Sequence, residues 1–526
     1  MKVRLLFDDH DVAPIVIPRN VQVLRQMLEE KAEPVVEDLI HDLDLRTVWD
    51  AMAGDDPVLL LAARRLFLAG PLTVDQVRYR HEVLLDALAH PHAVRRLYQL
   101  ADDALAAERE IYRGVLEDRE ERLMTRSVRV LDMLIDRMRD LRRFAAEQAP
   151  RFRSPGFTRL FAEIADQLGE PYLQEVERQL DELRFPEGFI LSADLGPGNR
   201  GVGYVLRRPA DRNRTGVFTR TIVKKPAFTF VLPERDEAGF RALSDLHDLG
   251  LERVAATVGR AADHVLRYFS ALRTEVAWYV GALNLYQRLR DLGRPACLPE
   301  PLPSDAPTLE AEELYDPALA LRLGGRVTGN TIGRRDVRLL VVTGANQGGK
   351  STFLRSIGLA HLMLRTGLFV PAEAFAAGVA TSVLTHFRRE EDATMTSGKF
   401  DEELRRMSKV VDRLRPGAVL LSNESFASTN EREGSEVAAE MVDALRDAGV
   451  RTLVVTHMYE LAHRYEVEND PGTLFLRAEP GEGGVRDHRL RPGPPRPSSY
   501  AADVYRSVFH LAEAGEDAGL RPEAQV

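Results

Sequence analysis

Apolar residues follow a helical spacing over most of the first third of the chain. Between about residues 21 and 183 they recur every three or four positions, as at Leu131, Leu134, Met138 and Leu141. This spacing places the apolar side chains on one face of an amphipathic helix. We therefore expect residues 1–187 to form a helical core.

The pattern changes twice in the next hundred residues. Between 188 and 235, short β-prone runs such as 203–206 and 217–223 are separated by Gly, Pro and Asn, which is typical of short strands and turns. Residues 252–292 then contain no proline and return to helical spacing. We expect a β-rich basic insertion at 188–235 and long lever helices at 236–292.

A proline-rich stretch separates this part from the rest of the chain. Because prolines recur between residues 293 and 307, neither a helix nor a central strand is expected there, and we interpret 293–319 as a linker. Beyond it, β-prone and helical runs alternate, which predicts an α/β domain at 320–510. The fold class is multidomain α plus α/β, with a loose polar tail at 511–526.

Composition limits the functions that the chain can have. Its 526 residues include one cysteine, Cys297, and no run of about 20 apolar residues, so we expect a cytoplasmic protein that does not enter the membrane. The net charge of -10 argues against a protein that coats nucleic acid non-specifically, because such proteins carry a basic excess. Any DNA contact must therefore be local.

Two basic segments are candidates for that contact. In the first, at 200–225, the predicted DNA-binding residues are Arg200, Arg207, Arg208, Arg212 and Arg214. The second lies on the helical pattern and holds Arg126, Arg129, Arg137, Arg139, Arg142 and Arg143. The alternative for both segments is that their arginines only face solvent and contact no DNA.

The strongest chemical signal is a Walker A sequence, or P-loop, at 344–351. It follows the apolar run 339–342 and leads into a helical pattern, so its glycines can turn backbone N–H groups around phosphates. Lys350 is expected to meet the β and γ phosphates, and Ser351 to place its hydroxyl on Mg²⁺. The residues predicted to bind ATP here are Gly344, Asn346, Gly348, Gly349, Lys350, Ser351 and Thr352.

Two later β-prone runs each end in a polar side chain. The run 418–422 leads to Asn423 and Glu424, where a Walker B acid pair belongs, and Glu424 is a candidate general base for the attacking water. The run 454–456 leads to His457, a candidate to hydrogen-bond the γ-phosphate or the water. We expect Lys350, Glu424 and His457 to be catalytic, with Ser351 and Asn423 at the metal.

These motifs resemble those of the MutS family of DNA mismatch-repair ATPases. The P-loop run 342–352, with its double glycine before lysine, and the Val-Pro-Ala at 370–372 are similar to that family. Four further motifs also match. The first is 397–400 together with Glu403, and the second is Asn423-Glu424 followed by Ser428-Thr429 and Gly434. The third is His457 followed by Glu460-Leu461, and the fourth is 499–501. The segments 45–49 and 79–84 look more loosely like the helical core of a MutS-like branch that lacks the N-terminal mismatch-reading domain.

The resemblance implies an ABC-type homodimer in which two ATPs, with Mg²⁺, are held between subunits. Ser428 and Thr429 would contact the ATP of the partner subunit, and Asn330 would lie at the adenine end. The implied activity is DNA-dependent ATP hydrolysis in mismatch repair, recombination or related DNA maintenance. Its DNA partner would be duplex, mismatched or branched.

Three departures from the family pattern leave an alternative open. Asn423 replaces the usual Walker B aspartate, and an amide brings no negative charge to a cation. Residues 426–428 read Phe-Ala-Ser instead of Gly-Arg-Gly, and no phenylalanine lies in the family's mismatch-reading context. The alternative is a nucleotide-gated scaffold with little ATP turnover and no mismatch recognition.

Overall fold

The structure is a computed structural model that describes most of the chain in two compact units. The described residues are 2–8, 17–111, 120–185, 190–199, 201–207, 233, 236–334, 336–345, 348–389, 398–478 and 487–496. One unit comprises Met1–Leu24 and Leu85–Val280, and the other comprises Arg25–Leu84 and Gly281–Val526. We call them the helical unit and the C-terminal unit.

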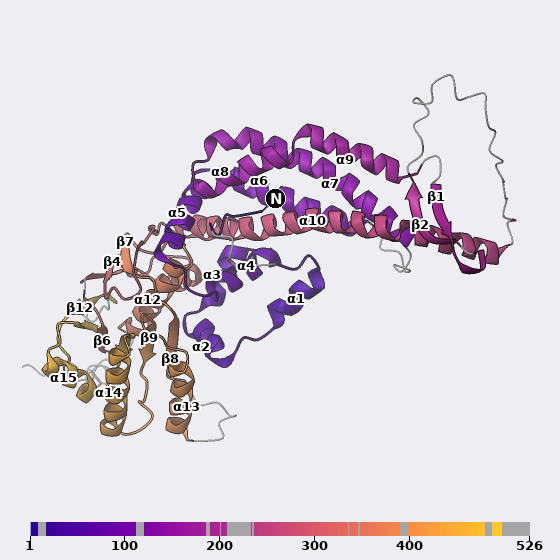
Figure 1. The fold of residues 1–526 in the computed structure, drawn as a ribbon. Coiled ribbons are helices and arrows are strands. Elements are labelled where there is room, and N and C mark those ends of the chain that lie inside the picture. Colours follow the sequence, from indigo (N-terminus) through magenta and orange to yellow (C-terminus); the bar gives the residue numbers. More distant parts are fainter. Residues whose placement is uncertain are drawn as a thin grey trace, which may run out of the picture. The chain divides into compact units, whose positions relative to one another are not determined.

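The helical unit confirms the helical prediction for the first third of the chain (Figure 1). Helix α7 packs against the helices that precede and follow it. The helices that lie in this unit, wholly or in part, are α1 (Val21–Glu29), α5 (Val74–Ala89), α6 (Pro91–Glu110), α7 (Glu120–Gln148), α8 (Pro155–Gln167), α9 (Glu170–Leu183) and α10 (Glu237–Asp291).

Helix α10 is one continuous helix of 55 residues where lever helices were expected. Its apolar positions in this unit, including Leu251, Val258 and Leu266, are buried, as the helical spacing requires. Arg273 of α10 pairs with Asp102 of α6 at 3.0 Å, and this buried cation is thereby compensated. Apolar burial along one face therefore holds α10 in the unit.

The β-rich insertion is described only in part. Strands β1 (Ile190–Leu195) and β2 (Gly201–Arg207) form an antiparallel hairpin, joined through the short turn η2 (Pro197–Asn199). Two of the expected β-prone runs thus form strands. The expected strands at 217–223 and 228–232 lie outside the described residues.

Three N-terminal helices belong to the C-terminal unit, which departs from the expected helical core at 1–187. Asp38 of α2 is buried and accepts a hydrogen bond from Arg406 at 3.2 Å, and it also pairs with Arg389. A buried carboxylate needs such partners, so the helix is bound to the unit that supplies them. These helices are α2 (Pro34–Asp42), α3 (Leu45–Ala53) and α4 (Pro57–Phe67).

Residues 293–319, which we expected to be a linker, contribute to a four-stranded sheet with the order β3-β7-β4-β5. Pro301 lies in β3, an edge strand, where a missing N–H breaks no central ladder. The helix α11 (Pro317–Leu323) follows the second strand. The strands are β3 (Glu300–Leu302), β4 (Leu309–Leu314), β5 (Asn330–Arg334) and β7 (Ala374–Gly378).

The predicted α/β pattern is confirmed by a six-stranded sheet with the order β12-β11-β6-β10-β9-β8. All neighbouring strands are parallel except the β11 and β12 pair. The strands are β6 (Leu339–Gly344), β8 (Val383–Phe387), β9 (Val419–Asn423), β10 (Arg451–Val455), β11 (Thr473–Ala478) and β12 (Leu490–Pro492).

Four helices accompany this sheet, and their ends follow local sequence signals. For example, Asn430 precedes α14, and its side chain accepts a hydrogen bond from the Glu433 backbone N–H at 2.9 Å. The helices are α12 (Lys350–Arg365), α13 (Lys399–Val411), α14 (Glu431–Asp447) and α15 (Tyr459–Glu468). In the described part of the chain, none of the helices has the length and apolarity to span a bilayer.

Three buried histidines make the C-terminal unit sensitive to acid. Burial lowers the pKa of His81 to about 4 and that of His386 to about 4, and it lowers the pKa of His361 well below its ordinary value. The unfolded chain takes up protons on these rings below a pH of about 6.5, whereas in the folded protein His81 and His386 do so only near a pH of about 4, and the pKa of His361 is also well below its ordinary value. Their contribution to stability is present above about 6.5 and is lost as the pH falls.

We predict that His361→Leu reduces this acid sensitivity. The Nδ1 atom of His361 is buried without a hydrogen-bond partner, so leucine removes a proton-binding group without breaking a hydrogen bond there. Between about pH 8 and pH 5 the unfolding temperature should fall less steeply than in the wild type. The exposed control His463→Gln should keep the wild-type slope, and equal slopes in all three proteins would contradict the prediction.

Candidate functional site

Three neighbouring parallel strands deliver the predicted catalytic side chains to one edge of the sheet. Strand β10 lies between β6 and β9, with Val455 paired to Val342 on one side and to Asn423 on the other. The carboxyl ends of parallel strands meet at the same edge, where α/β proteins bind ligands. Lys350 follows β6, Glu424 follows β9 and His457 follows β10, so the topology brings these sequence-distant residues together.

The P-loop forms a tight turn between β6 and α12. Gly344 and Gly349 both have positive φ angles, 111° and 87°, which favour glycine. Gly349 is the residue before α12, so the loop ends at a helix N-terminus, where free N–H groups attract anions. Asn346 lies outside the described residues, and Gly348 lies in the described part of the loop.

Lys350 is buried and folded back onto its own loop. Its Nζ donates hydrogen bonds to the carbonyl oxygens of Gly344 at 2.9 Å and Ala345 at 2.8 Å. These carbonyls hold the ammonium group at the mouth of the loop, where a phosphate would meet it. Lys350 thus lies in the loop with its ammonium group bound to two backbone carbonyls.

Ser351 and Asn423 meet at the position expected for a metal. The Ser351 hydroxyl donates to the Asn423 Oδ1 at 3.0 Å. Both oxygen donors are neutral, whereas divalent cations in nucleotide sites are held through at least one carboxylate together with the phosphates. In the described part of the chain, no group of three or more His, Cys, Asp or Glu residues is arranged to hold a metal. These residues therefore do not fit a resident divalent cation.

Among the described residues that line this end of the pocket, Glu424 is the only carboxylate, and Arg388 and His457 flank it. His457 Nε2 lies 2.9 Å from its Oε1, and Arg388 lies 3.7 Å from its Oε2. The contact with His457 lowers the pKa of Glu424 most strongly, against the opposing effect of burial. The charges of Lys350 and Arg388 lower it further, so the side chain remains an anion.

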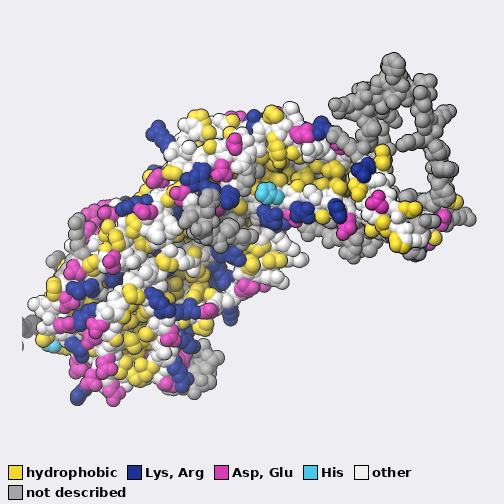
Figure 2. All heavy atoms as spheres, viewed as in Figure 1, with side chains coloured by type: hydrophobic (Ala, Val, Ile, Leu, Met, Phe, Trp, Pro, Cys, Tyr) yellow, Lys and Arg dark blue, Asp and Glu magenta, His cyan; other side chains and the backbone are white. Residues whose placement is uncertain are grey.

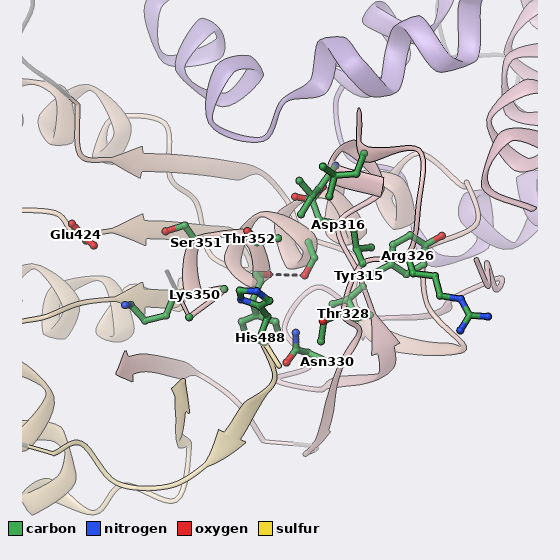
Figure 3. Close-up of a pocket in the computed structure, with 18 residues that line it drawn as sticks. Tyr315, Asp316, Arg326, Thr328, Asn330, Lys350, Ser351, Thr352, Glu424 and His488 are labelled. Atoms are coloured by element: carbon green, nitrogen blue, oxygen red, sulfur yellow. Dashed lines mark hydrogen bonds between the residues drawn. The ribbon is translucent and has the colours of Figure 1, made fainter. Parts of the chain in front are cut away.

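Lys350, Ser351 and Glu424 line one end of a pocket of about 390 Å³, and Asn423 and His457 contact this lining through Ser351 and Glu424. Figure 3 shows Glu424, Ser351 and Lys350 at one end and Tyr315, Thr328 and Asn330 at the other, with His488 between them. The far end also includes apolar side chains. The complete lining is Leu314, Tyr315, Asp316, Leu319, Leu323, Arg326, Val327, Thr328, Asn330, Gly348, Gly349, Lys350, Ser351, Thr352, Phe353, Ser356, Glu424 and His488.

Asn330, predicted to lie at the adenine end of the nucleotide, lines the far end of the pocket, and its side chain is used within the protein. Its Oδ1 accepts a hydrogen bond from the Leu490 backbone N–H at 2.7 Å. Thr328 donates to the Asp487 carbonyl at 2.9 Å, so both residues hold the segment that carries His488. Asn330 thereby shapes the wall of the pocket.

The sequence did not single out several residues that complete the pocket. His488 lies 138 positions after Lys350 and belongs to none of the sequence motifs described above. Its φ angle of 55° lies in the left-handed region, which is uncommon for a residue other than glycine. Tyr315 and Asp316 fall in the segment expected to be a linker. Asp316 is buried and pairs with Arg355 of α12, which ties the start of α11 to the P-loop helix. Burial raises the pKa of Asp316, and Arg355 opposes that rise.

The remaining predicted site residues are not brought into this pocket. Ser428 and Thr429 are not among its lining residues, and Thr429 donates a hydrogen bond to Glu433 at 2.9 Å. Of the predicted DNA contacts, Arg207 lies on β2 and donates to Ser192 at 2.8 Å. The predicted contacts Arg200, Arg208, Arg212 and Arg214 lie outside the described residues.

Two family models match the chain. The model described as MutS2 N-terminal domain matches residues 72–292, and the model described as MutS domain V matches residues 340–500. The second match spans the P-loop, Glu424 and His457.

Curated relatives agree with these matches. A DNA mismatch repair protein MutS from Desulforamulus reducens is 32% identical over 142 residues, which is 27% of this chain and 16% of that protein. A DNA mismatch repair protein MutS from Porphyromonas gingivalis is 30% identical over 200 residues, which is 34% of this chain and 22% of that protein. An Endonuclease MutS2 from Pelotomaculum thermopropionicum is 29% identical over 285 residues, which is 50% of this chain and 36% of that protein.

The matches, the fold and the site together define a multidomain, helix-rich protein with mixed sheets that carries MutS domain V, an ATPase domain. Its matched regions span between 16% and 36% of the length of these three relatives. The chain belongs to the MutS family. The resemblance found in the P-loop and strand-end motifs is thereby confirmed.

The backbone of the P-loop is the part of the site that tolerates least change. We predict that Gly344→Ala destabilises the protein by about 1 to 3 kcal/mol and disrupts the pocket, because the φ angle of 111° at this position is strained for alanine. The new Cβ would also lie 2.3 Å from the Ala478 carbonyl oxygen. Denaturant unfolding measures the effect. The control Gly333→Ala, where no heavy atom lies within 4 Å of the Cβ, should change stability by less than about 0.5 kcal/mol. Equal stabilities would contradict the prediction.

Proposed function

We propose that this chain is a MutS-like ATPase that binds DNA and couples that contact to the binding and hydrolysis of ATP. One observation carries the proposal, namely a single pocket with Lys350, Ser351 and Glu424 at one end and apolar side chains at the other. The names of the relatives support a role in mismatch repair, recombination or related DNA maintenance.

The two ends of the pocket suit the two ends of a nucleotide. The loop glycines, the helix N-terminus and the Lys350 ammonium suit a polyphosphate. Tyr315, Leu319 and Val327 offer flat and apolar surface that suits a base. A pocket of about 390 Å³ falls within the range of small-molecule sites. ATP is therefore the ligand that we propose.

Glu424 is the proposed general base. Its lowered pKa keeps it deprotonated near neutral pH, as a proton acceptor must be. His457, at 2.9 Å, is placed to hold the carboxylate in position. The proposed homodimer, with Ser428 and Thr429 at the ATP of the partner subunit, is compatible with their absence from the lining of this chain's own pocket.

The second candidate function is a nucleotide-gated scaffold that closes on ATP and hardly hydrolyses it. Asn423 favours it, because the neutral amide that meets Ser351 does not supply the charge that usually holds the hydrolytic metal. The two functions share the ATP pocket and differ in turnover.

Steady-state ATP turnover distinguishes the two. If Glu424 is the general base, Glu424→Gln should lower turnover about 100-fold or more while ATP still binds. The control Glu436→Gln changes an exposed glutamate on α14 that pairs with Arg432, and it should leave turnover unchanged. Turnover that is already minimal in the wild type, and the same in Glu424→Gln, would favour the scaffold.

An exposed face of α10 is the DNA contact that we propose within the described residues. Arg253, Arg260, His264 and Arg267 are all exposed, and their spacing places them on one side of the helix, opposite the buried apolar face. We call these four residues the α10 basic face. Figure 2 shows dark blue side chains gathered along this helix.

The geometry of the α10 basic face suits a phosphate backbone. Three arginines seven residues apart span about 21 Å along a helix, a length over which duplex DNA presents roughly a dozen phosphates. The acidic residues Glu252 and Asp263 lie on the flank of the face, and Asp263 is 3.7 Å from Arg19.

Most arginines of the second basic segment, by contrast, are already paired. Arg139 contacts Glu177 at 2.6 Å, Arg142 contacts Glu170 at 3.4 Å, and both Arg137 and Arg143 lie within 4 Å of Asp140, at 3.8 and 3.7 Å. These acids offset the positive charge of the second basic segment. The α10 basic face is therefore the better candidate.

We predict that replacing Arg253, Arg260 and Arg267 together with glutamine weakens duplex binding. The slope of log affinity against log salt should become shallower by up to about 3, since each lost phosphate contact contributes about 1. Fluorescence anisotropy over a salt series measures both quantities. The control replaces Arg137, Arg142 and Arg143 with glutamine, which gives the same change in charge. Equal losses in the two triple variants would contradict a specific role for the α10 basic face.

A further inference from the structure

Asn423 changes the charge balance at the phosphate end of the pocket. Its Oδ1 accepts the Ser351 hydroxyl at 3.0 Å, so the two groups satisfy each other without a cation between them. The amide carries no charge, and its nitrogen supplies two N–H donors that a carboxylate in this place would lack. A phosphate oxygen can accept such donors directly.

The remaining charges at this end are mostly positive. Lys350 lies at the mouth of the loop, and Arg388 lies 3.7 Å from Glu424. Among the Lys, Arg, Asp and Glu side chains named here, Lys350 and Arg388 stand against Glu424, which gives a sum of +1. An aspartate at position 423 would reduce this sum to zero. The surroundings therefore attract a polyphosphate without help from a metal.

A divalent cation has two tasks in an ordinary nucleotide site of this kind. It neutralises part of the phosphate charge, and it separates the phosphates from the nearby carboxylates that hold it. At this site the second task is smaller, because residue 423 is an amide and the carboxylate that remains, Glu424, lies beside Arg388 and His457. The first task is shared by Lys350, Arg388 and the positive end of the α12 helix dipole.

We propose that this pocket binds nucleoside triphosphate as the metal-free anion, with affinity that hardly depends on Mg²⁺, and that Asn423 is the residue that determines this. The inference rests on the nucleotide pocket proposed above. It concerns binding and does not require ATP to be hydrolysed.

Calorimetric titration of the full chain with ATP, in excess EDTA and in excess MgCl₂, tests the proposal. The wild-type Kd should differ by less than about threefold between the two buffers. Asn423→Asp should bind ATP at least about tenfold more weakly in EDTA and recover on addition of MgCl₂, because the new carboxylate repels the phosphates and then holds the cation.

A matched control separates this local effect from a change in overall charge. Asn469→Asp adds the same negative charge at an exposed residue that follows α15, away from the P-loop, and it should behave as the wild type. Titration with Mn²⁺ alone supplies a readout without nucleotide. Asn423→Asp should bind this ion measurably more tightly than the wild type does.

A wild-type affinity that falls more than about tenfold in EDTA would overturn the proposal, and so would an Asn423→Asp protein no more dependent on metal than the wild type. If Asn423→Asp does not fold, the wild-type comparison decides alone. Absence of ATP binding in both buffers would overturn the nucleotide pocket itself, whereas metal-dependent binding would overturn only this inference.

Discussion

The parallel pairing of β10 with β6 on one side and with β9 on the other is the constraint on which the site depends. In a parallel sheet the side chains that follow neighbouring strands emerge at one edge, whatever their separation along the chain. Asn423, Glu424 and His457 therefore meet the P-loop. The strands are buried and apolar, so a change of register would move charged residues into the core and is strongly disfavoured.

Buried charges fix the surroundings of that edge. Asp38 binds α2 to the arginines Arg389 and Arg406, and Asp316 binds the start of α11 to Arg355 of the P-loop helix. Removing one partner of such a pair leaves an uncompensated buried charge, which costs far more than the pair itself contributes. These buried ion pairs thus hold the elements around the pocket in place, because each charged side chain would lose its partner if the element moved.

In the helical unit, apolar burial holds the helices together and charged residues lie on the exposed faces. Apolar burial on one face holds α10 in place, and the opposite face is free to carry charges that interact with a partner. On α7 the arginines are offset by nearby acids, whereas the α10 basic face has its acids on the flank. A net negative protein can in this way offer a local positive surface, because the field near a surface reflects the closest charges.

The sequence by itself determined the helical character of the first third and the α/β order of the last part, and it singled out Lys350, Ser351, Glu424 and His457 as candidates for the site. These features follow from local spacing and from residues next to apolar runs, both of which are visible along the chain. Only the tertiary structure decided that α2 to α4 belong with the C-terminal unit, that the proline-rich segment contains the edge strand β3, and that His488 and Tyr315 line the pocket. The physical reason is that these contacts join residues far apart in sequence, and burial and charge pairing across such distances leave no periodic or contiguous signal.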